Sequence, residues 1–164
     1  MKAAVRSELF GGGWVLGERP VPAVKAGKVL VRVKVAALNP IDYKLPRMVA
    51  GAVPGLDVAG VVEAVGAGVS EFSVGDEVFG KGRGTIAELC STSAKNLTKK
   101  PLEMPWEVAG AANTTFLTAY QALTRHSKLR PGQSILIIGA SGGSGPYALT
   151  AEHHTASRRT APCS

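Results

Sequence analysis

The sequence predicts a β-rich α/β protein in which short strands come first and helices follow. Three observations carry this prediction. Apolar residues recur at every second position in the first two-thirds of the chain, the period then lengthens to that of a helix, and a continuous apolar run leads into a glycine-rich loop. Aromatic residues make up only 5% while glycine occurs 20 times, which suits β-packing with tight turns better than a helical bundle.

Four segments of the first two-thirds have the pattern of β-strands. Valine occupies every second position of residues 29–35, and residues 56–66 are rich in β-branched side chains. A short strand is expected over residues 75–80, and residues 85–90 alternate again. Glycine- and proline-rich joints such as 53–55 separate these segments. Strands at this spacing predict a small barrel or sandwich.

The hydrophobic pattern changes to a helical period after Pro105, a residue that suits the first turn of a helix because its missing N–H costs nothing there. Farther along, the Asn-Thr-Thr run at 113–115 is a candidate helix cap. A second helix with one apolar face is expected after it. The residues of that face are Phe116, Ala119, Tyr120 and Leu123.

A continuous apolar strand predicted over 134–138 runs directly into a glycine-rich loop. Glycine lets the backbone turn tightly and approach a pyrophosphate, and a helix expected near Pro146 would present free N–H groups and its positive dipole end. The succession of strand, loop and helix therefore predicts dinucleotide binding. The candidate cofactor-binding residues of the loop are Gly139, Ala140, Ser141, Gly142, Gly143, Ser144 and Gly145.

Residues 151–164 lack apolar periodicity and predict a polar tail. A continuous apolar strand needs neighbours in a parallel sheet, and because no second strand is evident we expect the nucleotide-binding domain to be incomplete. Arg158 and Arg159 lie about where a ligand for the cofactor ribose or its 2′-phosphate would come, but without a strand to place them we interpret them as tail. A change of reading frame or an exon boundary after Leu149 is our hypothesis for this loss of pattern.

Charge, cysteines and hydropathy exclude several classes of protein. The formal charge is +7, yet the cations are scattered singly apart from Lys99-Lys100 and Arg158-Arg159, so we do not expect nucleic-acid binding. Cys90 and Cys163 lie far apart and predict neither a disulfide framework nor a zinc knuckle. No apolar run reaches the length of a membrane span and no signal peptide is evident, which predicts a cytoplasmic protein, with an organelle as the alternative.

Taken together, these motifs resemble the medium-chain dehydrogenase/reductase superfamily, specifically its zinc-free quinone oxidoreductase and enoyl reductase branch. The matching segments are 33–44, 54–62, 65–66, 75–78, 117–123 and 139–145, in family order. The resemblance implies a GroES-like, partly open β-barrel over residues 1–112. It further implies a connecting helix with the first strand and phosphate loop of an incomplete Rossmann domain over 113–150, followed by an atypical polar tail over 151–164.

Two positions argue against zinc. The zinc-dependent relatives have a cysteine where this chain has Asn39 and a histidine where it has Leu56, and neither an amide nor a leucine can replace those ligands. The resemblance therefore implies no metal, with NADPH as the cofactor and NADH as the alternative. It implies hydride transfer to a small quinone or conjugated enone, whose developing negative charge needs only hydrogen-bond donors. Full-length relatives are expected to be homo-oligomers.

The resemblance also assigns candidate site residues. Asn39 would lie near the nicotinamide ribose or the substrate oxygen, Thr118 would contact the nicotinamide region, and Tyr43 and Lys44 are candidate donors at the cleft. Plainer alternatives exist, because Asn39 could begin a turn capped by Asp42 and Thr118 could be an ordinary helix hydroxyl. We expect a truncated enzyme with weak or no activity. The alternative is a non-catalytic module that binds a partner through its exposed apolar strand.

Overall fold

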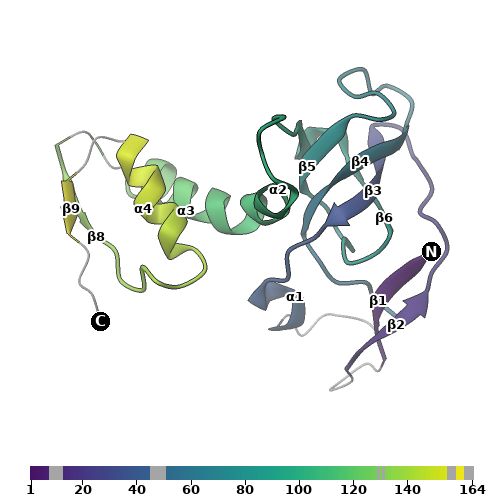
Figure 1. Ribbon diagram of the computed structural model, residues 1–164, viewed down its shortest axis with the longest axis horizontal. Coiled ribbons are helices and arrows are strands. Elements are labelled where there is room, and N and C mark those ends of the chain that lie inside the picture. Colours follow the sequence, from purple (N-terminus) through teal and green to yellow (C-terminus); the bar gives the residue numbers. More distant parts are fainter. Residues whose placement is uncertain (8–12, 45–50, 129, 131, 155–157, 161–164) are drawn as a thin grey trace. The chain divides into compact units, whose positions relative to one another are not determined.

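The computed structural model describes residues 1–7, 13–44, 51–128, 130, 132–154 and 158–160. The chain divides into two compact units, Met1–Ala111 and Ala112–Ser164, and each is considered by itself. The first unit consists mostly of strands and the second mostly of helices (Figure 1). No helix in the described part of the chain has the length and apolar character needed to cross a bilayer.

Five strands of the first unit form one antiparallel sheet in the order β6–β3–β4–β5–β7. Their bounds are Lys28–Val35 for β3, Asp57–Val65 for β4, Glu77–Lys81 for β5, Leu89–Ser93 for β6 and Leu97–Lys99 for β7. The strands predicted over 29–35, 56–66 and 75–80 are confirmed to within two residues at each end.

The two edge strands of this sheet are consecutive in the chain. Only the single 3-10 turn η1 (Ala94–Asn96) separates β6 from β7. Five flat strands about 4.8 Å apart would hold the edges about 19 Å apart, whereas three 3-10 residues advance only about 6 Å. The sheet must therefore curl. The hydroxyl of Thr92 in β6 donates to the carbonyl oxygen of Lys81 at the end of β5, at 2.8 Å, which joins the two sides of the resulting barrel.

A separate pair of strands, β1 (Lys2–Arg6) and β2 (Trp14–Glu18), runs antiparallel beside the barrel. The segment 85–88 connects β1 to β3. The amide of Ala4 donates to the Ile86 carbonyl. The amide of Glu88 donates to the Lys2 carbonyl, and the Glu88 carbonyl accepts from the Val33 amide. The strand predicted over 85–90 is thus wrong for its first four residues. The backbone of residues 85–88 bonds to β1, to β3 and to residues 54–55, and the regular strand β6 begins only at Leu89.

The core of the first unit comes from the strand positions that the sequence pattern singles out. Val29 and Val31 are fully buried because β-branched side chains pack well on a pleated surface. The helix α2 (Trp106–Ala111) packs on β3, β4 and β5. Its first turn forms when the Ala109 amide donates to the carbonyl of Pro105 at 3.0 Å, which confirms the predicted helix start. The core cluster contains Val29, Val31, Val58, Val62, Phe72, Val78, Ala94 and Leu97.

The second unit begins with a continuous helical stretch. It consists of the π-helical turn η2 (Ala112–Phe116), helix α3 (Leu117–Gln121) and a second π-helical turn η3 (Ala122–His126). The helix predicted from the apolar face at 116–123 is confirmed and is longer than that face.

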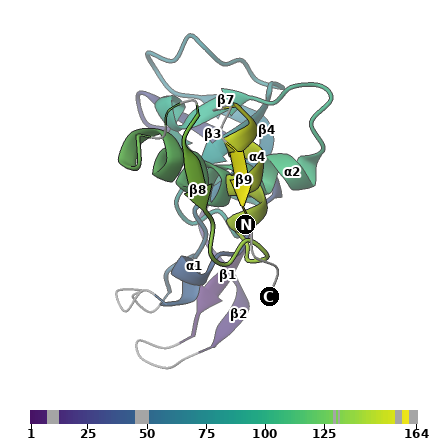
Figure 2. The same ribbon diagram turned by 90° about the vertical axis from the view of Figure 1, so that its left-hand side faces the viewer.

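After this stretch the chain forms β8 (Ser134–Leu136), helix α4 (Gly145–His154) and β9 (Arg158–Thr160). Strands β8 and β9 pair in parallel and lie side by side in Figure 2. The sequence predicts a polar tail over 151–164 with no evident second strand, whereas the described residues of this segment include the end of α4 and the strand β9. Helix α4 brings the chain back beside β8, where β9 pairs with it in parallel. Pairing of two strands uses backbone hydrogen bonds, so it does not require an apolar pattern in the sequence.

The apolar strand predicted over 134–138 is shorter than expected and is not covered on both faces. Strand β8 ends at Leu136, which is 60% exposed, and Ile138 is 86% exposed. Within the described chain its paired neighbour is the three-residue β9. One short neighbour cannot bury the side chains that point away from the sheet, which explains the difference.

Candidate functional site

The predicted catalytic residue Asn39 lies where the chain leaves β3 and enters the short helix α1 (Pro40–Lys44). Its backbone amide donates to Asp42 Oδ2 at 2.7 Å, and the Asp42 amide donates back to the Asn39 carbonyl at 2.9 Å. This reciprocal pair fixes the start of the helix in the manner of a capping box. This is the capped turn that the alternative interpretation of Asn39 and Asp42 predicts.

The side chain of Asn39 takes part in a second, longer-range contact. Its Nδ2 donates to Oδ2 of Asp57, the first residue of β4, at 2.9 Å. Asn39 is 6% exposed and Asp57 is fully buried. Because a carboxylate only accepts hydrogen bonds, the NH₂ group must face Asp57 and the amide oxygen must point the other way. Asn39 is thus a fixed side chain with a defined acceptor oxygen.

Tyr43 and Lys44 follow on α1 but do not join this cluster. Tyr43 is 51% exposed, and the Lys44 ammonium lies 6.0 Å from the centre of its ring. Neighbouring residues on a helix point in different directions. Among the described residues neither side chain hydrogen-bonds to Asn39. The structure therefore brings Asn39 together with Asp42 and Asp57 and leaves the other two candidates at the surface.

The contribution of Asp57 escapes sequence reasoning. Asp57 opens β4, whereas Asn39 lies in the connection between β3 and α1, and no local pattern links the two positions. The one usable indication is that an acidic residue opens an otherwise apolar strand, where a buried carboxylate requires hydrogen-bond partners.

The glycine loop makes two successive turns before α4. Gly139 has a φ of +77°, and the amides of Gly142 and Gly145 donate to the carbonyls three residues earlier, each at 3.0 Å. A Cβ atom at Gly145 would collide with the carbonyl group of Ala140, so only glycine permits this close approach. At Gly143, by contrast, an added Cβ would meet nothing within 4 Å.

Several backbone N–H groups of the loop have no hydrogen-bond acceptor among the described residues; those of Ser141, Gly143 and Ser144 are among them, and these three residues are exposed. The carbonyl of Ser144 accepts the first bond of α4, from Ala148 at 3.1 Å. Free N–H groups at the start of a helix form a recognised setting for phosphate binding. The loop predicted from the sequence thus has the backbone geometry expected of it.

Thr118 lies in α3 with its side chain exposed. Near it, the ring of Phe116 stacks on Tyr120 and meets the ring of Tyr147 edge-on, with centroids 6.1 and 5.9 Å apart. The second contact holds α4, and with it the end of the glycine loop, against the last residue of η2, which precedes α3. The predicted cofactor-binding residues therefore share the second unit, whereas Asn39 belongs to the first.

In the part of the chain that the structure describes, no three histidine, cysteine, aspartate or glutamate side chains gather closely enough to hold a metal ion. Cys90 is buried in the barrel, and its thiol donates weakly to the Arg83 carbonyl at 3.7 Å. Burial raises the pKa of this thiol, because a thiolate there would lose its hydration. Cys90 is accordingly a core residue rather than a reactive one.

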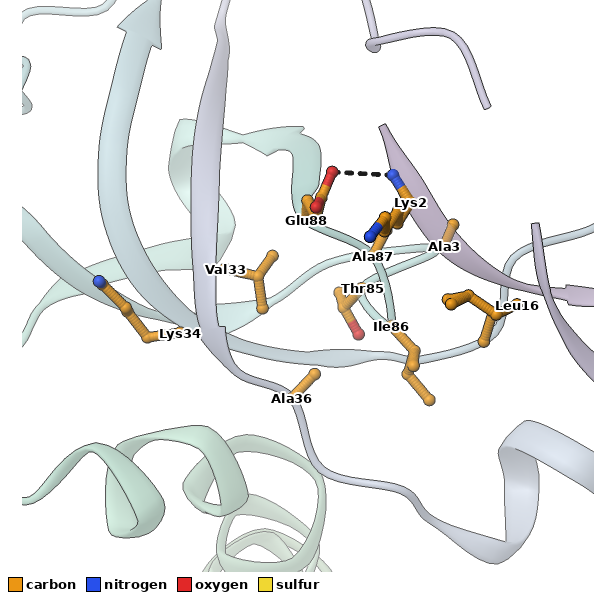
Figure 3. Close-up of a pocket in the computed structure, with 11 residues that line it drawn as sticks. Lys2, Ala3, Leu16, Val33, Lys34, Ala36, Thr85, Ile86, Ala87 and Glu88 are labelled. Atoms are coloured by element: carbon orange, nitrogen blue, oxygen red, sulfur yellow. Dashed lines mark hydrogen bonds between the residues drawn. The ribbon is translucent and has the colours of Figure 1, made fainter. Parts of the chain in front are cut away.

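A cavity of about 500 Å³ lies in the first unit between β1, β3 and the segment 85–88 (Figure 3). On one side the Lys2 amide donates to Glu88 Oε2 at 2.8 Å, and Val33 and Ala36 lie opposite. The hydroxyl of Thr85 is buried and has no hydrogen-bond partner among the described residues. None of the predicted site residues lines this cavity.

Comparison with known proteins defines the class of this fold. The alcohol dehydrogenase GroES-like domain family matches residues 25–157. The chain is 36% identical to a quinone oxidoreductase of Lama guanicoe over 155 residues, which are 87% of this chain and 46% of that protein.

Solved structures agree. An alcohol dehydrogenase superfamily protein from Novosphingobium aromaticivorans matches 98% of this chain and 53% of its own with a TM-score of 0.91 and 31% identity. A mycobacterial protein solved in complex with NADPH matches 96% of this chain and 51% of its own, with a TM-score of 0.84 and 29% identity.

The chain belongs to the medium-chain dehydrogenase/reductase superfamily, through its GroES-like domain, and is quinone oxidoreductase-like. The resemblance seen in the sequence motifs is thereby confirmed. The chain spans about half the length of the curated relatives it matches.

Proposed function

We propose that this chain supplies the GroES-like domain and the phosphate loop of a zinc-free, NADPH-dependent reductase of quinones or conjugated enones, with weak or no activity of its own. The observation that carries the proposal is the loop 139–145, whose free N–H groups lie between β8 and α4. The similarity to a quinone oxidoreductase and to an NADPH-bound protein supports the choice of acceptor and cofactor.

The loop would bind the pyrophosphate of NADPH through the amides of Ser141, Gly143 and Ser144, aided by the positive end of α4. Thr118, exposed on α3, would contact the nicotinamide region. The residue types fit this cofactor, because the loop needs no side chains for phosphate recognition and the chain offers no competing carboxylate within it. When bound, NADPH supplies the hydride.

The orientation of Asn39 favours one of its two candidate roles. Its NH₂ group is engaged by Asp57, so the atom best placed to meet a ligand is the amide oxygen. An acceptor suits a ribose hydroxyl, which can donate a hydrogen bond. It does not suit a carbonyl oxygen that gains negative charge during reduction. We therefore assign Asn39 to the nicotinamide ribose, and Tyr43 and Lys44 to the donation of hydrogen bonds to the substrate oxygen.

Titration of the purified chain with NADPH tests the role of the loop. The wild-type chain is expected to bind more weakly than micromolar, because two short strands supply few contacts for the adenosine half. Gly145→Ala should abolish the remaining affinity, since its methyl group collides with Ala140, whereas Gly143→Ala places a methyl group in open space and should retain it. Equal binding by both variants would overturn the role of the loop.

Quinone-dependent oxidation of NADPH tests the activity itself, followed by cofactor absorbance. The chain is expected to turn over slowly, and Asn39→Ala should raise the KM for NADPH more than it lowers kcat, because the lost contact is to the ribose. An unchanged KM in Asn39→Ala would contradict the assignment.

The alternative function, a non-catalytic module derived from such an enzyme, rests on a different observation. Leu136 at the end of β8 and Ile138 two residues beyond it are exposed and would offer an apolar surface to a partner. Size-exclusion chromatography of the chain without cofactor separates the two. A monodisperse, folded chain with no NADPH affinity favours the module, whereas stabilisation by NADPH favours the reductase.

A further inference from the structure

A second cavity, of about 300 Å³, lies in the first unit at the seam where the curled sheet closes. Three strand ends and the turn between β6 and β7 meet there. Lys28 begins β3, Lys81 ends β5, and Ser93 ends β6, while Asn96 belongs to η1 and Arg83 follows β5. The backbone around this seam cavity is held by the bond from Thr92 to the Lys81 carbonyl and by the pairing of Lys28 with Ser93.

The charges around the seam cavity all have one sign. Lys28, Lys81 and Arg83 line it, and no lining residue is acidic. Other cations of this unit have carboxylate partners, as in the pairs Arg32–Glu63 and Lys100–Glu77. The three cations of the seam cavity form no ion pair with any described residue. A concave surface lined by one sign of charge concentrates oppositely charged ligands.

Neutral donors complete the seam cavity. The hydroxyls of Ser91 and Thr92 already donate to backbone carbonyls. The hydroxyl of Ser93 and the side-chain amide of Asn96 have no hydrogen-bond partner in the described part of the chain. Three cations and two free donors around a small polar cavity match the several acceptor oxygens of a tetrahedral oxyanion. Ser93 is half-buried and Asn96 is exposed, so both side chains can donate a hydrogen bond to a ligand that enters the cavity.

We propose that the seam cavity binds a phosphate group, either as free phosphate or as the phosphate of a small monoester. This site lies in the first unit and uses side-chain cations, whereas the glycine loop lies in the second unit and uses backbone N–H groups. The proposal does not depend on the reductase function. It assigns a function, phosphate binding, to three of the positively charged side chains of this protein.

Amide chemical-shift titrations of the full chain test this proposal, with ionic strength held constant by chloride. Inorganic phosphate forms one arm and glycerol 3-phosphate the other. We expect saturable shifts at residues 81–83 and 91–96. We expect Lys81→Gln and Arg83→Gln each to weaken binding there about tenfold, since each removes a charge-assisted contact. The tighter arm identifies the source of the phosphate group.

Two variants serve as controls. Arg125→Gln removes an equal charge from the second unit, and Gly145→Ala disturbs the glycine loop. Neither variant should change the phosphate-induced shifts at residues 81–83 and 91–96. Ser93→Ala removes only a neutral donor and should weaken binding with no change in net charge. The proposal is overturned if neither anion shifts these amides at millimolar concentration, or if Arg125→Gln weakens binding as much as Lys81→Gln does.

Discussion

Replacing Lys100 by methionine should destabilise the first unit far more than the same change at its neighbour Lys99. The Lys100 side chain is only 4% exposed. Its ammonium lies 2.9 Å from Glu77 Oε2, donates to the carbonyls of Met104 and Pro101 at 2.9 and 3.1 Å, and lies 4.9 Å from the centre of the Trp106 ring. The Lys100 side chain thus links β5, the end of β7 and the segment that precedes α2.

The magnitude follows from these contacts. Hydrogen bonds from a charged donor contribute about 1.5–3 kcal/mol when well formed, and a cation over an aromatic ring about 0.5–2 kcal/mol. Glu77 is 44% exposed, so the ion pair itself contributes at most about 1 kcal/mol. The carbonyls regain some hydration and methionine keeps the apolar stem, which reduces the loss. We expect Lys100→Met to cost about 2–3 kcal/mol of the free energy of unfolding.

Lys99 is the matched control, since its side chain is 60% exposed and pairs only with Asp76, at 2.8 Å. Lys99→Met should cost less than about 1 kcal/mol. Urea unfolding followed by tryptophan fluorescence reports the first unit, which holds both tryptophans, Trp14 and Trp106. The midpoint should fall by about 1–2 M for Lys100→Met. Equal losses for the two variants would refute the reasoning.

Three further predictions concern single side chains. The hydrogen bond from Lys99, with that from the Ser73 amide, holds the pKa of Asp76 below its ordinary value of 3.8. The stabilising effect of Asp76 is therefore present above that value and lost as the pH falls through the lower native pKa, so urea midpoints of wild type and Asp76→Asn should converge in acid. In a Cys163→Ser background, Cys90 of the native protein should react with iodoacetamide many times more slowly than in denaturant. Burial raises the pKa of its thiol and blocks access of the reagent. Rapid labelling of the native protein would contradict this. Asn39→Asp should destabilise the chain by about 1–3 kcal/mol at neutral pH and by less in acid, because it places a second carboxylate beside that of Asp57. A loss of stability that does not depend on pH would argue against the contact between residues 39 and 57.

The sequence predicts the barrel strands well because their pattern is local. Valine at every second position of residues 29–35 suffices to give both a strand and its buried face, as Val29 and Val31 show. Residues 85–88 mislead for a physical reason. Alternation indicates an extended backbone but not its partners, and this segment divides its hydrogen bonds among β1, β3 and residues 54–55.

Long-range contacts of the candidate site are beyond such patterns. The glycine loop is predicted because strand, turn and helix are consecutive in the chain. The contact of Asn39 with Asp57 depends instead on where β4 begins relative to α1, which tertiary packing decides. The same holds for β9, whose sequence carries no strand pattern and which pairs in parallel with β8.

The three-residue connection between the two edge strands also bears on how the first unit folds. The pairs Lys28 with Ser93 and Gly80 with Leu97 join positions that are distant along the chain. Their formation therefore costs loop-closure entropy before stabilising contacts form. Such non-local topologies fold on the slow side, in milliseconds to seconds. During synthesis the barrel cannot close until Lys99 has left the ribosome, and until then both edges of the sheet are open to pairing with other chains.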